Sequence, residues 1–399
     1  MTDVSNPELP TGSWTYRNWH ASSTSAEEFA EEIPLYSDAR FTGEVRSGLG
    51  PYLLLNTVPD PHEAGTVVPV AMLRVSGHLP DDTDQVVKAF RAGVPDAGAF
   101  TGGTTYDEIA SLVSLAHRVR LAVGAPTRWF YKGDTDGRGS PRHSAGSTPT
   151  IPEGRQRNVI PELLRTTALT TDLLSTYPTI EWTSARELAR AARSYRQALW
   201  VAGADGNLAW LFLVSAAETA ANEWSRLRAD PHLSPAALLY FMRPDYSARL
   251  QKAAAEQAEA VLNEVGETQN TVLRAQWKFR EFLLTFGRDA PQPRPKAWPT
   301  DWTEKGMKKT LDLVYRYRSE ALHASKPFPL PMCESPFPSE DEHGVPAWAE
   351  KPGGASYQGG GLWTADQLPI NLYAFHHLVA TALHGWWREL AHAAATSAD

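Results

Sequence analysis

Cysteine is almost absent from this sequence: Cys333 is the only one among 399 residues. A single thiol excludes an internal disulfide, and such low cysteine content is typical of proteins in a reducing compartment. No stretch approaches the ~18 consecutive apolar residues of a membrane-spanning helix. The start of the chain has neither the basic nor the apolar segment of a secretion signal. We therefore expect a cytoplasmic protein without membrane contact.

An excess of positive charge is also lacking. Lys and Arg number 38 against 46 Asp and Glu, which gives a formal net charge of −8. Proteins that bind nucleic acid over their whole surface are usually basic, so any such contact should use a local patch. The glycines of "GAFTGGTTY" are not followed by the lysine of a phosphate-binding loop. We predict neither a metal nor another cofactor.

The sequence does contain ample material for a core, with 42% hydrophobic residues and 14 Trp. In the first part of the chain, apolar runs bounded by Gly and Pro predict strands, and amphipathic stretches predict helices. The predicted elements are strands at residues 50–58 and 65–77 and helices at residues 82–93 and 105–123. The second helix opens with a capping box formed by Thr105 and Glu108. We predict a small α+β domain over residues 1–150, with a possible sensor or regulatory role.

The sequence from residue 156 to 399 has helical periodicity, and we predict an all-α domain there, which makes the chain mainly α overall. It should be almost wholly helical outside two proline-rich segments, residues 288–299 and 327–361. The stretch from Ala209 to Trp224 is strongly apolar and should form a central buried helix. The predicted helix boundaries are a capping box at Ser184 and Glu187 and C-terminal glycines at Gly266 and Gly287.

One predicted helix, from about residue 301 to 325, ends in the stretch "VYRYRSEALHAS". Arg316 and His323 are nearly eclipsed on an ideal helix, whereas Arg318 and His323 are about 140° apart. We expect Pro327 to loosen the last turn and let Arg318 reach His323. A guanidinium suits phosphate oxygens, and an imidazole exchanges protons near neutral pH. Such a pair could move a proton at a 2′-hydroxyl, which restricts the chemistry to RNA.

The segment "YRYRSEALHAS" resembles the Arg-x4–6-His signature of the HEPN superfamily of helical domains. Its sequence looks closest to that of the abortive-infection (Apea-like) branch. The resemblance implies a metal-independent endoribonuclease, in which Arg318 and His323 are catalytic and Tyr315 and Ser319 flank them. Ser319 departs from the pattern, because many nuclease members have Asn, Asp or His directly after the arginine. A role in bacterial antiviral defence is what the family suggests.

The resemblance covers about residues 160–399. The stretch "LVSAAETAANEW", which carries Glu218, also resembles the first core helix of that branch. Glu218 would either orient a catalytic side chain or pair with a structural arginine, and both roles stay open. The residues from Glu304 to Lys326 include six Lys or Arg and three acidic residues. Such a locally basic stretch suits RNA binding, with Arg316 and Lys326 as candidates, but is also compatible with an ordinary solvated face.

Two other interpretations remain open. The cations at the end of this helix could simply offset the helix dipole, or bind another ligand. Acid–base cleavage requires two titrating groups, so the nuclease hypothesis predicts a homodimer in which two copies of residues 315–325 face each other. The alternative function is a catalytically silent HEPN-like module that dimerises, while the N-terminal domain binds a ligand or partner.

Overall fold

The computed structural model describes residues 12–55, 57, 67–79, 98–132, 137–142, 146, 148–150, 159–228, 275–354 and 356–397. Contacts divide the chain into two units. The first comprises Met1–Leu213 and Trp387–Asp399, and the second comprises Val214–Trp386. The division therefore lies at residues 213–214 and 386–387, and not between residues 150 and 156, where the two predicted domains meet. No helix among the described residues is long and apolar enough to cross a membrane.

The first unit contains an antiparallel sheet with the strand order β3-β4-β1-β6-β7, and β5 also pairs with β1. Its strands are β1 (Phe29–Ser37), β3 (Tyr52–Leu55), β4 (Val68–Gly77), β5 (Ala122–Val123), β6 (Arg128–Tyr131) and β7 (Ser140–Pro141). Strands β3 and β4 lie within the two apolar runs predicted to be strands. The α+β character of the N-terminal region is therefore confirmed.

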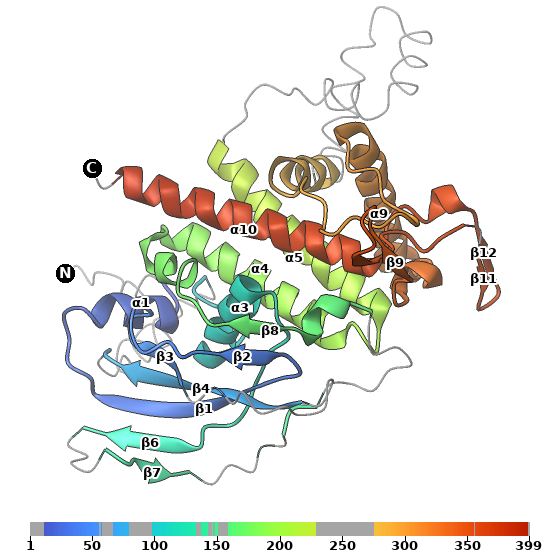
Figure 1. Ribbon diagram of the computed structural model, residues 1–399. Helices are drawn as coiled ribbons and strands as arrows, with labels where there is room; N and C mark the ends of the chain where they lie inside the picture. The colour runs from blue at the N-terminus through green and yellow to red at the C-terminus, as the bar shows by residue number, and fades with distance from the viewer. Residues whose placement is uncertain are drawn as a thin grey trace, which may run out of the picture. The chain divides into compact units, whose positions relative to one another are not determined.

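Among the described residues, the helices of this unit are α1 (Trp14–Ala21), α3 (Thr105–His117), α4 (Trp182–Val201), the first residues of α5 (Gly206–Arg228) and the last residues of α10 (Leu372–Ser397), with short 3-10 segments at Pro161–Leu164 and Leu174–Thr179. Figure 1 shows α1 and α3 on the same side of the sheet. Alternation along β1 places Glu31, Ile33 and Leu35 on one face, and all three are buried. The Tyr106 hydroxyl of α3 donates to the Glu31 carboxylate, which identifies this face as the one that α3 covers.

Neither predicted capping box forms at the predicted residues. Helix α3 is capped by Thr104, whose hydroxyl accepts from Asp107 N at 3.2 Å, and the Asp107 carboxylate accepts from Thr104 N at 3.1 Å. Glu108 cannot return to the helix start, because its buried carboxylate accepts from the hydroxyls of Ser13 and Tyr177.

The second predicted capping box does not form, and the N-cap lies three residues earlier than predicted. Helix α4 is capped by Glu181, whose carboxylate accepts from Thr183 N at 3.0 Å and from Ser184 N at 3.4 Å. Glu187, the expected partner of Ser184, instead pairs with Arg186 and Arg190 along the helix.

Residues after 160 are not as uniformly helical as predicted. A short strand, β8 (Thr166–Ala168), pairs in parallel with β2 (Arg40–Thr42) of the N-terminal region. Two small antiparallel sheets lie within the proline-rich segment, one formed by β9 (Pro338–Glu340) and β10 (Pro346–Trp348), the other by β11 (Ser356–Gln358) and β12 (Gly361–Trp363). The predicted helices at residues 82–93 and before Gly266 lie outside the described residues.

The second unit is mainly helical. It contains most of α5, a helix over residues 275–286, α9 (Glu304–Ala324) and most of α10 (Leu372–Ser397). Ala217, Ala220 and Ala221 of α5 are buried, as predicted for a central helix. The helix over residues 275–286 ends where predicted, before Gly287. A Cβ at Gly287 would lie 2.7 Å from a methyl carbon of Leu378, so glycine here permits close packing of α10.

Candidate functional site

Helix α9 carries most of the predicted site residues and is regular to its end. It begins at a Thr303 cap, whose hydroxyl accepts from Gly306 N at 3.2 Å. Its buried side includes Met307, Leu311 and Val314. The helix closes at Ser325, which has a left-handed φ of 52° and donates its N–H to the Glu320 carbonyl. The loosening of the last turn that we expected from Pro327 therefore does not occur.

Because α9 stays regular, it separates the two residues predicted to be catalytic. Arg318 and His323 are five residues apart, which leaves their directions about 140° apart around the helix. Arg318 Nη2 contacts Glu218 Oε2 of α5 at 2.8 Å, and only 23% of the Arg318 side chain is exposed. His323 is exposed and forms no hydrogen bond or ion pair with any described residue. The structure thus does not bring Arg318 and His323 together.

Glu218 lies at the centre of a small polar cluster under α9. The Arg318 guanidinium contacts its carboxylate and also lies 5.6 Å from the ring centroid of Tyr315. Burial raises the pKa of the Tyr315 hydroxyl, and the neighbouring charge of Glu218 raises it further. The Tyr315 ring packs against Phe279 at 5.4 Å. Glu218 thus pairs with Arg318, the arginine predicted to be catalytic, and this contact is compatible with both roles left open for Glu218.

The exposed side of α9 presents a different set of residues. Arg316 is 60% exposed and lies 3.9 Å from Glu320, whose carboxylate also contacts Lys326 Nζ at 2.7 Å. A spacing of seven residues places Arg316 and His323 on the same side of the helix. Lys305 and Lys309 are exposed on that side as well. We call Lys305, Lys309, Arg316 and His323 the outer row of α9. Ser319 is half-buried next to Arg318.

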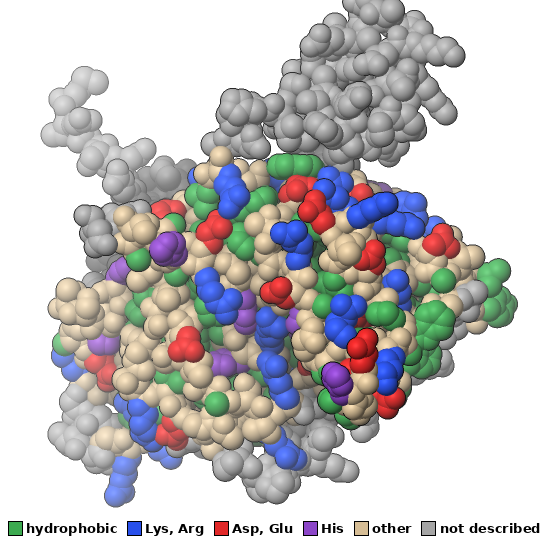
Figure 2. Space-filling view, turned by 45° about the horizontal axis from the view of Figure 1, so that its top comes forward, with side chains coloured by type: hydrophobic (Ala, Val, Ile, Leu, Met, Phe, Trp, Pro, Cys, Tyr) green, Lys and Arg blue, Asp and Glu red, His purple; other side chains and the backbone are tan. Residues whose placement is uncertain are grey.

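Cations and carboxylates are mixed on the protein surface. On the face shown in Figure 2, Lys and Arg side chains lie among Asp and Glu side chains, without one continuous basic area. Asp312 of α9 contacts Arg280, which lies in the helix over residues 275–286, at 3.2 Å. Any nucleic-acid contact would therefore be local, as the net charge suggests.

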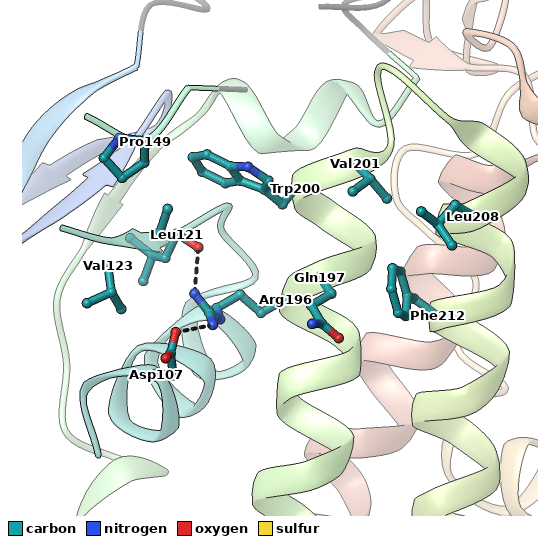
Figure 3. Close-up of a pocket in the computed structure, with 11 residues that line it drawn as sticks. Asp107, Leu121, Val123, Pro149, Arg196, Gln197, Trp200, Val201, Leu208 and Phe212 are labelled. Atoms are coloured by element: carbon teal, nitrogen blue, oxygen red, sulfur yellow. Dashed lines mark hydrogen bonds and ion pairs between the residues drawn. The ribbon is translucent and has the colours of Figure 1, made fainter. Parts of the chain in front are cut away.

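The first unit holds a second candidate site, which sequence reasoning missed. An open groove of about 450 Å³ lies beside α4 (Figure 3). Trp200 and Arg196 project from α4 toward Leu121 and Val123, and Leu208 and Phe212 come from α5. The lining is assembled from segments far apart in the sequence, so no local motif could have indicated it.

Arg196 is the main charged group of this groove and is almost fully engaged. It donates to Asp107 Oδ1 at 2.7 Å, to Ser111 Oγ at 3.0 Å and to the Leu121 carbonyl at 3.3 Å. Burial tends to raise the pKa of Asp107, but Arg196 and Thr104 outweigh it and the pKa is lowered. The pair therefore stays ionised and internally neutral. A neutral pair within apolar walls suits an uncharged, largely apolar ligand.

Comparison of the chain with protein-family models, with curated proteins and with solved structures finds no match. The assignment of roles to the residues of α9 and of the groove therefore depends on their chemistry and positions.

Proposed function

We propose that this protein binds and cleaves RNA without a metal ion, and that the outer row of α9 contacts the RNA. The observation that carries the proposal is the exposure of His323 on the same side of α9 as Arg316. Imidazole is the side chain that most often serves as a general acid or base in catalysis. The Arg316 guanidinium offers a fork of donors to phosphate oxygens. Both groups reach solvent, where an RNA backbone would lie.

In this proposal the neutral imidazole of His323 removes the proton of a 2′-hydroxyl. The 2′-oxygen then attacks the adjacent phosphorus, and the bond from phosphorus to the 5′-oxygen breaks. The leaving oxygen takes a proton from a second, protonated imidazole. One copy of the chain supplies one such histidine on α9, so the acid would come from His323 of a second copy. The products are a cyclic 2′,3′-phosphate and a 5′-hydroxyl.

Arg318 has a different role here from the one that the HEPN resemblance implies. Its contact with Glu218 fixes α9 against α5, which makes it a positioning residue. The resemblance, in contrast, assigns Arg318 to catalysis. The two assignments differ in which arginine variant retains activity, and this difference can be measured.

The test is cleavage of labelled RNA in the presence of EDTA. His323→Ala should lower the cleavage rate by about 100- to 10,000-fold and leave the melting temperature unchanged, because the side chain is exposed. Arg316→Ala should weaken RNA binding and reduce its salt dependence. Arg318→Ala should lower the free energy of unfolding by about 1–3 kcal/mol, because it leaves Glu218 unpaired.

If Arg318→Ala abolishes cleavage without loss of stability, the Arg-x4-His assignment is correct and the outer row is not. If all three variants cleave like the parent, the activity does not come from α9.

A second candidate function is favoured by the groove beside α4. In this case the helical unit is catalytically silent, and the N-terminal unit binds a small, largely apolar ligand. The uncharged dye Nile red is a suitable probe of the folded protein. Leu208→Arg in the groove should reduce dye binding, whereas Leu227→Arg, at a leucine that is 49% exposed, should not. Equal dye binding by both variants would remove support for this function.

A further inference from the structure

An aromatic surface lies at the edge of the sheet in the first unit. Strands β1 and β6 are antiparallel, with Phe29 opposite Tyr131 and Glu31 opposite Trp129. Alternation along each strand therefore places Phe29, Trp129 and Tyr131 on the same face of the sheet as Glu31. Helix α3 covers this face at Glu31, and Tyr131 lies at the end of β6. Trp14 of α1 adds a ring beside Phe29. We call Trp14, Phe29, Trp129 and Tyr131 the aromatic row.

The rings of the aromatic row follow one another in nearly parallel orientation. The Phe29 and Trp129 centroids are 5.8 Å apart with an angle of 29° between the rings. Trp129 and Tyr131 are 6.0 Å apart at 25°, and Trp14 and Phe29 are 6.3 Å apart at 33°. Tyr131 is 62% exposed, and the other three rings are half-buried. A core cluster would bury its last ring, but this row ends with a ring that solvent reaches.

Cations accompany this row. Arg142 lies over the Trp129 ring, with its guanidinium carbon 4.9 Å from the centroid. The described residues of 126–132 and 137–142 include four cations and no acidic residue. They are Arg128, Lys132, Arg138 and Arg142. Lys132 contacts Glu28 at 2.7 Å across the strand pair, but both side chains are exposed, and such pairs contribute little. The loop of the hairpin carries Asp134 and Asp136, and alternation along β6 turns Arg128 and Lys132 away from the face of Trp129 and Tyr131. Arg142 is therefore the cation that accompanies the aromatic row.

We propose that the aromatic row, through its exposed ring Tyr131, is a stacking surface for the unpaired bases of single-stranded nucleic acid, and that Arg142 contacts a phosphate. An exposed flat ring with a cation beside the row matches what such ligands offer, because unpaired bases expose their faces and each nucleotide carries a phosphate. A duplex hides its base faces, so it should bind more weakly. This inference goes beyond the function proposed for α9, because binding at β6 requires no cleavage.

The test is equilibrium binding of the full chain in EDTA, followed by fluorescence anisotropy. The probes are a labelled 2′-O-methyl oligouridine, which has no 2′-hydroxyl to react, and a labelled oligothymidine. Tyr131→Ala should weaken binding by roughly 5- to 100-fold, the typical effect of removing one stacking ring. Tyr131→Phe should bind like the parent, because stacking needs the ring and not the hydroxyl. Tyr357→Ala is the matched control, since Tyr357 is a tyrosine of the second unit that is 74% exposed.

A second pair of variants tests the phosphate contact. Arg142→Ala should lower the slope of log K against log salt by about 0.7, as expected for one lost contact with a single strand. Arg46→Ala, at an arginine that is 68% exposed and paired with Glu44, should leave the slope unchanged. The 2′-O-methyl probe cannot be cleaved, so a failure of the cleavage mechanism would not be mistaken for a failure of this site.

Binding of both probes, or of one of them, with loss on Tyr131→Ala supports the proposal, and the comparison shows whether the sugar contributes. Absence of binding to either probe overturns it. Equal affinities of the Tyr131→Ala and Tyr357→Ala variants also overturn it, because the aromatic row would then serve only the packing of the sheet edge.

Discussion

Buried polar side chains are where single residues matter most in this protein. His117, at the end of α3, is 6% exposed. Burial lowers the pKa of this imidazole to about 4, and the neighbouring charge of Arg165 acts in the same direction. The histidine is therefore neutral in the folded protein at pH values where the unfolded chain, with an ordinary pKa of about 6.5, already binds a proton. Its contribution to stability is present above about pH 6.5 and is lost as the pH falls toward 4.

We predict that His117→Gln removes part of the acid sensitivity of the fold. Between about pH 6.5 and 4, the free energy of unfolding of the parent should fall more steeply than that of the variant, by up to about 1.4 kcal/mol per pH unit. Urea unfolding at several pH values measures this difference. His323→Gln is the control, because that side chain is exposed, and its slope should equal that of the parent. Equal slopes for all three proteins would contradict the prediction.

Residue patterns located the start of α3 only to within one position. Thr104 and Thr105 are both suitable caps, and Asp107 and Glu108 are both suitable partners, so the sequence allows two registers. The structure chooses the first, because Glu108 is buried among the hydroxyls of Ser13, Thr101 and Tyr177. Those partners come from distant segments, and no local pattern contains that information.

Among the elements, long helices followed from periodicity, but the end of α9 did not. We expected Pro327 to disturb the last turn. Proline restricts the residue before it, which is Lys326 and lies outside the helix. The turn ends instead at Ser325, in a left-handed conformation that favours glycine. The separation of Arg318 from His323 follows directly from this regular ending.

We predict that Ser325→Gly stabilises the protein by about 0.5–1 kcal/mol, because glycine adopts a positive φ without the strain of a Cβ. Ser319→Gly, in the interior of the same helix, is the matched control and should destabilise by about 0.5–1 kcal/mol. Urea unfolding monitored by circular dichroism at 222 nm gives both values. A loss of stability for Ser325→Gly would show that the serine side chain contributes more than its backbone strain costs.

Strand β8 shows a second limit of sequence reasoning at this scale. Three residues, "TTA", carry too little periodicity to be distinguished from a loop. Their partner is β2, far earlier in the chain, and the pairing is extended by hydrogen bonds from Arg40 N to the Arg165 carbonyl and from Leu169 N to the Thr42 carbonyl. Pairing between distant segments determines this strand.

At the scale of the whole molecule, the predicted domains meet between residues 150 and 156, and the contacts divide the chain elsewhere. Segments on both sides of residues 150–156 pair with each other through β2 and β8. The contacts divide the chain inside α5 and α10, where helical periodicity continues without a break. Composition and proline content cannot mark such a boundary.

The assembly that the cleavage mechanism requires gives a prediction for the whole molecule. One chain offers one His323, and the reaction needs a base and an acid, so the active form should be a symmetric homodimer. Light scattering should give a mass of twice 43.9 kDa. An equal mixture of parent and His323→Ala chains, after subunit exchange, should have about a quarter of the activity of the same total amount of parent, because only parent–parent pairs hold both groups. Independent monomers would retain about half, which would show that each chain acts alone.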